Sequence, residues 1–237
     1  MFPCLMYHEI IAGGPIGKFG VRMGDFIAQM DYLYKEGYRT IDLASDSDIC
    51  DRKTVLVTFD DGHASNYQAA KVMKERNQTG VFYVLQEETL NNADFLTEEN
   101  IKEIADMGHI IGVHGKNHDW WTCKDLDLLV TEISDVSRWI ESITGRQVIT
   151  CSAPGGKVNG RIAQMILRRV DGMRYVRNSV PWWNKNLPDS GIINATAVLN
   201  STSIEDFAKV VGLDMSSYCR QMMWYSVKGV AKSILKR

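Results

Sequence analysis

Several features that define special classes of protein are missing from this sequence. No stretch reaches the roughly 18 to 20 apolar residues that a membrane-spanning helix requires. Lysine and arginine number 27 against 29 acidic residues, so the formal net charge is -2 and the basic excess of a general nucleic-acid binder is absent. The five cysteines include no Cys-x-x-Cys pair, which argues for a reducing compartment and against a disulfide framework or a thiolate zinc site.

The first residues also show none of the marks of a secretory leader, since they contain no basic region, no long apolar core and no small-residue cleavage site. We therefore expect a cytoplasmic location. The composition is that of an ordinary globular protein, with 45% hydrophobic and 24% charged residues over 237 positions. A chain of this length can bury a full core, and we expect residues 1–237 to form a single domain.

The positions of the histidines are more informative than their number, because every histidine lies in the first half of the chain. The five are His8, His63, His109, His114 and His118. Any imidazole that binds a metal or transfers a proton must come from this set. We expect His63 and His109 to be structural, the second at the start of its strand and far from the site.

Short β-branched runs alternate with helical patterns along the whole chain. Lys53–Phe59 has the composition of a buried strand, while Asp25–Glu36 and Lys124–Thr144 carry apolar residues at helical spacing. Strands that alternate with helices of this length indicate βα units and a parallel sheet. We therefore predict an α/β domain whose sheet is either open or closed into a barrel.

The last segment predicts a basic amphipathic helix at about 216–235. Between Cys219 and Arg237 it carries basic and apolar side chains and no acidic one. Such a helix can make peripheral contact with an anionic membrane surface, which would place the protein at the inner membrane face. In the commoner arrangement the helix packs on the domain and keeps its basic edge in water.

Two adjacent carboxylates, Asp60 and Asp61, directly follow the strand-like run, and Gly62 then turns the chain. In parallel α/β folds, active sites gather at the carboxyl ends of the strands. Neighbouring residues at a strand end point in different directions, so one carboxylate can bind a metal while the other addresses a water. The alternative is a helix cap beside a solvated acid, because a helical pattern begins at Ser65.

Two imidazoles four residues apart, His114 and His118, follow another strand-like run. Gly112 and Gly115 argue against a helix here and favour the end of a strand. Two histidines and one aspartate form a common ligand set for catalytic zinc, which leaves a position open for water. A single His-x-x-x-His pair is weak, but it becomes strong when it is combined with the two aspartates at another strand end.

Together, T-F-D-D-G at 58–62 and G-H-I-I-G-V-H-G-K-N-H at 108–118 resemble the motifs of the polysaccharide deacetylase family, also known as the NodB homology family or carbohydrate esterase family 4. The resemblance extends over most of the chain, with L-M-Y-H at 5–8 and S-A-P-G-G at 152–156 in the expected order. It implies a distorted (β/α) barrel of the seven-stranded type. It also implies a hydrolase that removes an N-acetyl group from an amino sugar of a surface polysaccharide or its precursor.

Residue by residue, the resemblance makes Asp60 the catalytic base and Asp61, His114 and His118 the ligands of a divalent metal, zinc being the first choice. Such an ion polarises the acetyl carbonyl and lowers the pKa of a bound water. A backbone N–H of the turn at Pro154 and Gly155 would hold the oxyanion.

The sequence also departs from the family pattern. Gly115 replaces a serine or threonine, and Ser152 stands where an arginine commonly steadies the catalytic aspartate, so we expect that arginine to be absent. No histidine is left to supply the late general acid. His8 could take this role, as in circularly permuted members of the family, provided that the first strand closes the barrel beside the last. The alternative is a structural histidine at the end of the first strand.

Trp182 and Trp183 follow a proline in an irregular segment and could stack on a sugar face, although loop packing is equally reasonable. The expected partner is an N-acetylated sugar or glycan, such as a nucleotide- or lipid-linked precursor, and no nucleic acid. Two other functions stay open. One is an O-acetyl esterase or other amide hydrolase on the same scaffold, and the other is a glycan-binding protein without activity.

Overall fold

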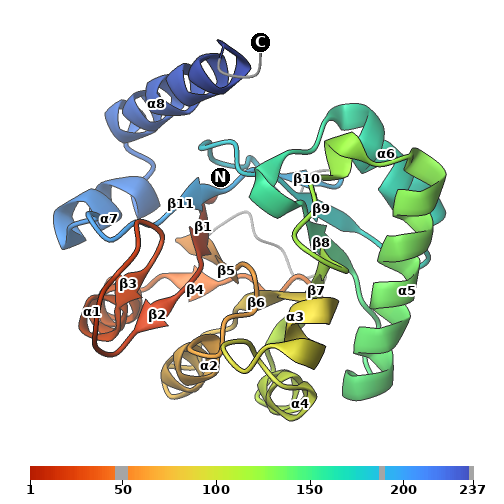
Figure 1. The fold of residues 1–237 in the computed structure, drawn as a ribbon. Coiled ribbons are helices and arrows are strands. Elements are labelled where there is room, and N and C mark those ends of the chain that lie inside the picture. The colour runs from red at the N-terminus through yellow and green to blue at the C-terminus, as the bar shows by residue number, and fades with distance from the viewer. Residues whose placement is uncertain (46–52, 187–189, 235–237) are drawn as a thin grey trace.

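A parallel sheet forms the centre of the protein and helices surround it (Figure 1). The computed structural model describes residues 1–45, 53–186 and 190–234, without the side chains of Trp224 and 226–234. Cys50 and the last position of the expected C-terminal helix, 235, lie outside the described residues. The strands of the sheet are β1 (Cys4–Tyr7), β4 (Arg39–Thr40), β5 (Thr54–Phe59), β6 (Val81–Leu85), β7 (Ile110–Gly115), β8 (Thr150–Ser152), β9 (Tyr175–Arg177), β10 (Ile192–Ile193) and β11 (Thr196–Ala197).

The order of the strands gives a distorted barrel. The sheet runs β10-β9-β8-β7-β6-β5-β1-β11, with β4 paired to β5. Strand β1 pairs in parallel with β5 on one side and with β11 on the other, so the first strand lies beside the last. The distorted (β/α) barrel expected from the sequence is confirmed. In the described part of the chain this sheet has nine strands and not the expected seven, because β4 and β10 each add a two-residue pairing.

Helices cover the outer face of the curled sheet (Figure 1). In chain order they are α1 (Met23–Lys35), α2 (Asn66–Lys74), α3 (Gln86–Asn91), α4 (Glu98–Asp106), α5 (Leu126–Thr144), α6 (Gly160–Arg169), α7 (Ile204–Val211) and α8 (Met215–Ile234). Helices α1, α5 and α8 agree with the ranges expected from the sequence to within two residues. Helix α3 and the small pair of β2 (Ile10–Ile11) with β3 (Val21–Arg22) were not expected, because such short elements carry too few residues to show a period.

Helix α5 illustrates how local sequence sets these elements. The Asp125 side chain accepts hydrogen bonds from the backbone N–H groups of Asp127 and Leu128, which caps the first turn. Gly145 ends the helix in the left-handed conformation, with a φ of 66°. Between these ends, an apolar stripe that includes Ile133 and Ile140 is buried.

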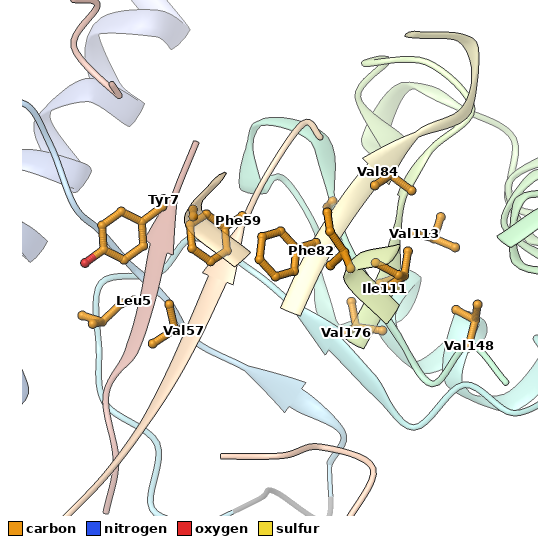
Figure 2. Packing of buried hydrophobic residues seen from close by; sticks show 14 of the residues in the cluster. Leu5, Tyr7, Val57, Phe59, Phe82, Val84, Ile111, Val113, Val148 and Val176 are labelled. Atoms are coloured by element: carbon orange, nitrogen blue, oxygen red, sulfur yellow. The ribbon is translucent and has the colours of Figure 1, made fainter. Parts of the chain in front are cut away.

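The core has two layers, because successive residues of a strand point to opposite faces of the sheet. The outer layer lies between the sheet and the helices, and Figure 2 shows it as a row of side chains that runs from strand to strand. At its centre the rings of Phe59 and Phe82 stack with 4.4 Å between centroids. Burying one such side chain contributes roughly 1.5–3 kcal/mol. The inner layer, which includes Met6 and Tyr83, fills the barrel interior and fixes the strand ends above it.

Helix α8 confirms the expected C-terminal helix and extends away from the barrel (Figure 1). It is anchored near its start, where the Tyr218 hydroxyl donates a hydrogen bond to the Val210 carbonyl of α7. Within the described ranges, no helix is both long and apolar enough to cross a membrane.

Candidate active site

The residues expected to act in catalysis lie at the carboxyl edge of the sheet. Strand β5 ends at Phe59, and Asp60 and Asp61 follow it. Because Tyr7 pairs with Phe59, His8 and Asp60 leave the two neighbouring strands at the same level. His114 is the penultimate residue of β7, which is separated from β5 by β6 alone.

Asp61, His114 and His118 come together as a cluster that could hold a metal ion. One ligand atom from each lies within 4.8 Å of the other two. The Nε2 atoms of His114 and His118 lie 3.1 Å and 3.4 Å from the same Asp61 oxygen, Oδ1. Asp61 reaches this position because its backbone has a φ of 69°, a left-handed conformation that is uncommon outside glycine.

The ring of His114 is oriented by the backbone of the next strand. Its Nδ1 lies 2.9 Å from the carbonyl oxygen of Ser152. Because a carbonyl only accepts, Nδ1 carries a hydrogen, and Nε2 is the ring atom that faces the cluster and could bind a metal ion. A ring fixed in this way is typical of histidines that bind metals.

The chemistry of the cluster fits a divalent cation such as zinc. Asp61 Oδ1 is buried and has no well-aligned hydrogen-bond donor among the described residues, although two imidazole nitrogens are close to it. A metal ion would satisfy all three atoms at once. Burial alone would raise the pKa of Asp61, but the two imidazoles lower it well below its ordinary value, so the carboxylate is ionised. Asp61 in turn raises the pKa of His118.

Asp60 is held by an arginine that the sequence interpretation missed. Arg177 Nη2 donates to both Asp60 Oδ1 and Ser152 Oγ. Position 152 is a serine, but the expectation that no arginine steadies Asp60 is wrong, because Arg177 does so. Arg177 ends β9 and pairs directly with Ser152 of β8, so the guanidinium reaches the position from the neighbouring strand.

Burial makes this ion pair strong. The side chains of Arg177 and Asp60 are 0% and 5% exposed. Burial would lower the pKa of Arg177, but the charge of Asp60 beside it keeps that pKa above its ordinary value. Arg177 Nη1 also donates to Ser179 Oγ at 3.2 Å, which fixes the guanidinium plane. One signal in the sequence could have indicated this role. Arg177 ends a buried strand, and the other site residues also lie at the ends of strands.

His8 follows β1 at the carboxyl edge of the sheet, level with Asp60. Burial lowers the pKa of His8 below the ordinary value of 6.5, although the nearby charges of Asp60 and Asp61 act to raise it. Its Nδ1 is buried and finds no hydrogen-bond partner in the described part of the chain. The ring packs on Phe19, with 4.8 Å between centroids. The required position of β1 beside the last strand is confirmed, whereas the role of His8 stays a prediction.

Comparison with known proteins agrees with this geometry. Residues 48–174 match a family model described as polysaccharide deacetylase. The chain belongs to the polysaccharide deacetylase family. The resemblance that the two aspartate and histidine motifs indicated is thereby confirmed.

Two curated relatives come from Bacillus subtilis. YxkH, whose name assigns it to the polysaccharide deacetylases, is 29% identical over 164 residues. These residues are 66% of this chain and 57% of the relative. The peptidoglycan-N-acetylmuramic acid deacetylase PdaA is 33% identical over 99 residues, or 40% of this chain and 35% of the relative. This chain thus spans 57% and 35% of the lengths of the two relatives.

A solved structure shows the same fold. The deacetylase PplD of Streptococcus pyogenes, determined in complex with acetate, has a TM-score of 0.78 and 21% sequence identity. The match covers 89% of this chain and 97% of PplD.

The remaining residues that we expected to contact the substrate follow β8 and β9. Pro154 and Gly155 belong to a single turn of 3-10 helix, Pro154–Gly156, that begins two positions after the end of β8, and Gly155 has a φ of 63°. A Cβ atom at Gly155 would lie 3.1 Å from Nε1 of Trp120, so the turn approaches the segment that follows His118.

Trp182 and Trp183 pack within the protein in this structure. Their rings stack on each other, with 4.2 Å between centroids. Both also contact the Tyr218 ring of α8, at 6.1 Å and 5.2 Å. This packing agrees with the structural alternative for the pair, and a sugar-binding role stays a prediction.

Proposed function

We propose that this chain is a metal-dependent hydrolase that removes an N-acetyl group from an amino sugar of a surface polysaccharide or its precursor. The proposal rests on one observation: Asp61, His114 and His118 converge beside a second aspartate, Asp60, that a buried arginine holds. Hydrolysis of an amide needs both a site that polarises the carbonyl and a base that activates water. The name of PdaA, an N-acetylmuramic acid deacetylase, favours the N-acetyl group of an amino sugar as the target.

Asp61, His114 and His118 would hold the divalent ion, for which zinc is our first choice. When bound, it would polarise the acetyl carbonyl and lower the pKa of a water molecule. The ligand set is the two-histidine, one-carboxylate type that leaves a position open for substrate and water.

The protein's own groups divide the proton transfers. Arg177 fixes Asp60 through Oδ1, and we assign to Oδ2 the proton of the attacking water. We assign to His8 the protonation of the leaving nitrogen, since β1 brings it to the level of Asp60. The lowered pKa of His8 makes its protonated form a stronger acid. We assign to a backbone N–H of the turn that begins at Pro154 and Gly155 the stabilisation of negative charge on the acetyl oxygen.

Acetate release tests the proposal. Purified protein loaded with zinc should release acetate from N-acetylated glucosamine or muramic acid oligomers. Asp60→Asn should bind zinc as before and release almost no acetate, because only the base is lost. His114→Ala should lose both zinc and activity. The proposal fails if the zinc-loaded protein releases no acetate from any of these sugars and Asp60→Asn behaves identically.

The two alternatives make different predictions in the same assay. An O-acetyl esterase would release acetate from O-acetylated glycans and leave the N-acetyl groups intact. A glycan-binding protein without activity would retain sugar without metal and without turnover. The intact cluster of Asp61, His114 and His118 counts against this last possibility, because a protein that loses activity usually loses its metal ligands as well.

We also propose that α8 makes peripheral contact with a membrane. This proposal rests on the basic and apolar composition of residues 219–237. Co-sedimentation with vesicles of anionic lipid, compared with vesicles of neutral lipid, tests it. Binding to the anionic vesicles that disappears in high salt would support the contact.

A further inference from the structure

The loop that carries His118 rests on an ion pair that lies outside the motif residues. Glu132 of α5 accepts a hydrogen bond from the backbone N–H of Lys116 at 3.2 Å through Oε1. Its other oxygen, Oε2, accepts from Lys124 Nζ at 2.5 Å. Lys124 also lies 3.5 Å from Asn117 Oδ1 in the same loop. The pair therefore contacts the two residues that immediately precede His118.

The pair is sheltered, unlike most ion pairs on this protein. The side chains of Lys124 and Glu132 are only 18% and 16% exposed. Charges at this depth are screened less by water and salt than charges at the surface. Salt should therefore weaken the Lys124–Glu132 ion pair less than it weakens an ion pair at the surface.

The loop needs support from outside because its own sequence supplies little. Gly115 starts it with a φ of +119°, a conformation that side chains rarely allow. A Cβ atom at this position would lie 2.9 Å from the Asn117 carbonyl oxygen. The sharp turn thus requires glycine, and glycine offers no side chain to hold the loop. Glu132 Oε1 would be 3.6 Å from that Cβ, so the carboxylate occupies the adjoining space.

The two histidines of the cluster differ in how they are held. The His114 side chain is 1% exposed, and the Ser152 carbonyl fixes its ring. The His118 side chain is 48% exposed. With less packing around the ring, the position of His118 depends more on the backbone of its loop.

We propose that the Lys124–Glu132 ion pair positions His118 as a metal ligand by fixing the backbone of the loop at 116–117. This inference rests on the proposed metal site and adds two positioning residues to it. On the opposite side, the Lys116 carbonyl accepts from the backbone N–H of Glu87 at 2.8 Å. That contact does not depend on the identity of a side chain, so Glu132 and Lys124 are the side chains that a substitution can test.

Zinc affinity of the full chain is the direct measurement. Glu132→Gln keeps the size of the side chain and one oxygen that can accept from the Lys116 N–H, but removes the negative charge that pairs with Lys124. Lys124→Met keeps the length of the side chain and removes the ammonium group. Each should weaken zinc binding by about 10- to 100-fold, as is usual when groups that orient a ligand are removed. Competition with a chelating indicator gives the dissociation constants without any assay of activity.

A second readout separates positioning from a general loss of stability. Cobalt(II) bound in place of zinc should show an altered visible absorption spectrum in both variants, because the geometry at His118 changes. The double variant should lose less affinity than the two single losses combined, since it leaves no unpaired sheltered charge.

The matched control lies on the same helix. Asp135 pairs with Arg138 on α5, and both side chains are exposed, at 56% and 69%. Asp135→Asn should leave zinc affinity and the cobalt spectrum unchanged. If Glu132→Gln does not fold, Lys124→Met carries the test alone.

The outcomes distinguish a failure of the proposed metal site from a failure of the positioning role of Lys124 and Glu132. If the unchanged protein binds no zinc, the proposed function is overturned, and this inference with it. If the unchanged protein binds zinc and both variants bind it equally well with the same cobalt spectrum, the inference alone is overturned. In that case the pair serves only the stability of the fold, which a lowered unfolding temperature in the variants would show.

Discussion

The guanidinium of Arg177 and the carboxylate of Asp60 form a buried ion pair, although 117 positions separate them in the sequence. They belong to β9 and to the end of β5, with three strands between them across the barrel. Removing one partner of a buried pair leaves an uncompensated charge, which costs about 3–5 kcal/mol. The pair therefore bears on stability as well as on the direction of the carboxylate.

Exchanging Arg177 of β9 and Ser152 of β8 tests whether Asp60 needs an arginine beside it. Arg177→Ser should lower kcat/KM for deacetylation by about 10²-fold or more, because Asp60 loses the group that orients it. Adding Ser152→Arg to this variant should restore part of the activity. The two positions face each other in the register of β8 and β9, so the guanidinium can return to Asp60 from the other strand.

Kinetics and urea unfolding of both variants provide the check. Arg174→Ser, at an exposed position just before β9, is the control and should leave both measurements nearly unchanged. Equal activity in the Arg177→Ser variant and the double variant would show that an arginine at position 152 does not replace Arg177.

This pair also marks the limit of what the sequence could predict. Asp60, Asp61, His114 and His118 lie within short local motifs at strand ends, so their convergence follows from a parallel sheet. Arg177 belongs to no such motif and acts through the register of two strands that are 23 positions apart at their nearest ends, from Ser152 to Tyr175. Register of this kind depends on tertiary packing, which one sequence does not reveal.

The assignment of His8 as the acid predicts a dependence on the leaving group. His8→Gln should slow release of acetate from an N-acetyl sugar by about 10²- to 10⁴-fold, because an amine must be protonated before it leaves. Hydrolysis of p-nitrophenyl acetate should change little, since a nitrophenolate leaves without a proton. Steady-state rates on both substrates supply the comparison. An equal loss on both would show that His8 holds the structure of the site instead.

Gly115 predicts a selective effect on metal binding. Gly115→Ala should cost about 1–3 kcal/mol of stability through its positive φ, and should also weaken zinc binding, because the new Cβ meets the Asn117 carbonyl. Gly108→Ala is the matched control, with a φ of +95° and nothing within 4 Å of the new Cβ. It should lose stability and keep its zinc affinity. Unfolding by urea and zinc competition measure the two quantities, and a similar drop in zinc affinity in both variants would refute the selectivity.

His109 predicts how stability depends on pH. Its Nδ1 accepts from the Gly80 N–H at 3.1 Å, and its Nε2 lies 2.9 Å from the Ala70 carbonyl, which fixes the neutral ring. Burial lowers its pKa from 6.5 to about 4. Between these values the unfolded chain binds a proton that the folded protein does not. Stability should therefore fall as the pH drops from about 6.5 toward 4, by up to roughly 3 kcal/mol.

Replacing this ring isolates its contribution from that of the carboxylates. His109→Gln keeps a donor for the Ala70 carbonyl and has no group that titrates in this range. It should be less stable than the unchanged protein at pH 7, by about 1–3 kcal/mol for the imperfectly replaced hydrogen bonds. The difference should shrink at pH 5. The unchanged protein loses stability there because folding keeps His109 unprotonated, whereas the glutamine variant has no such group. Urea unfolding of metal-free protein at the two pH values measures both differences, and a constant difference would mean that His109 does not contribute to the pH dependence.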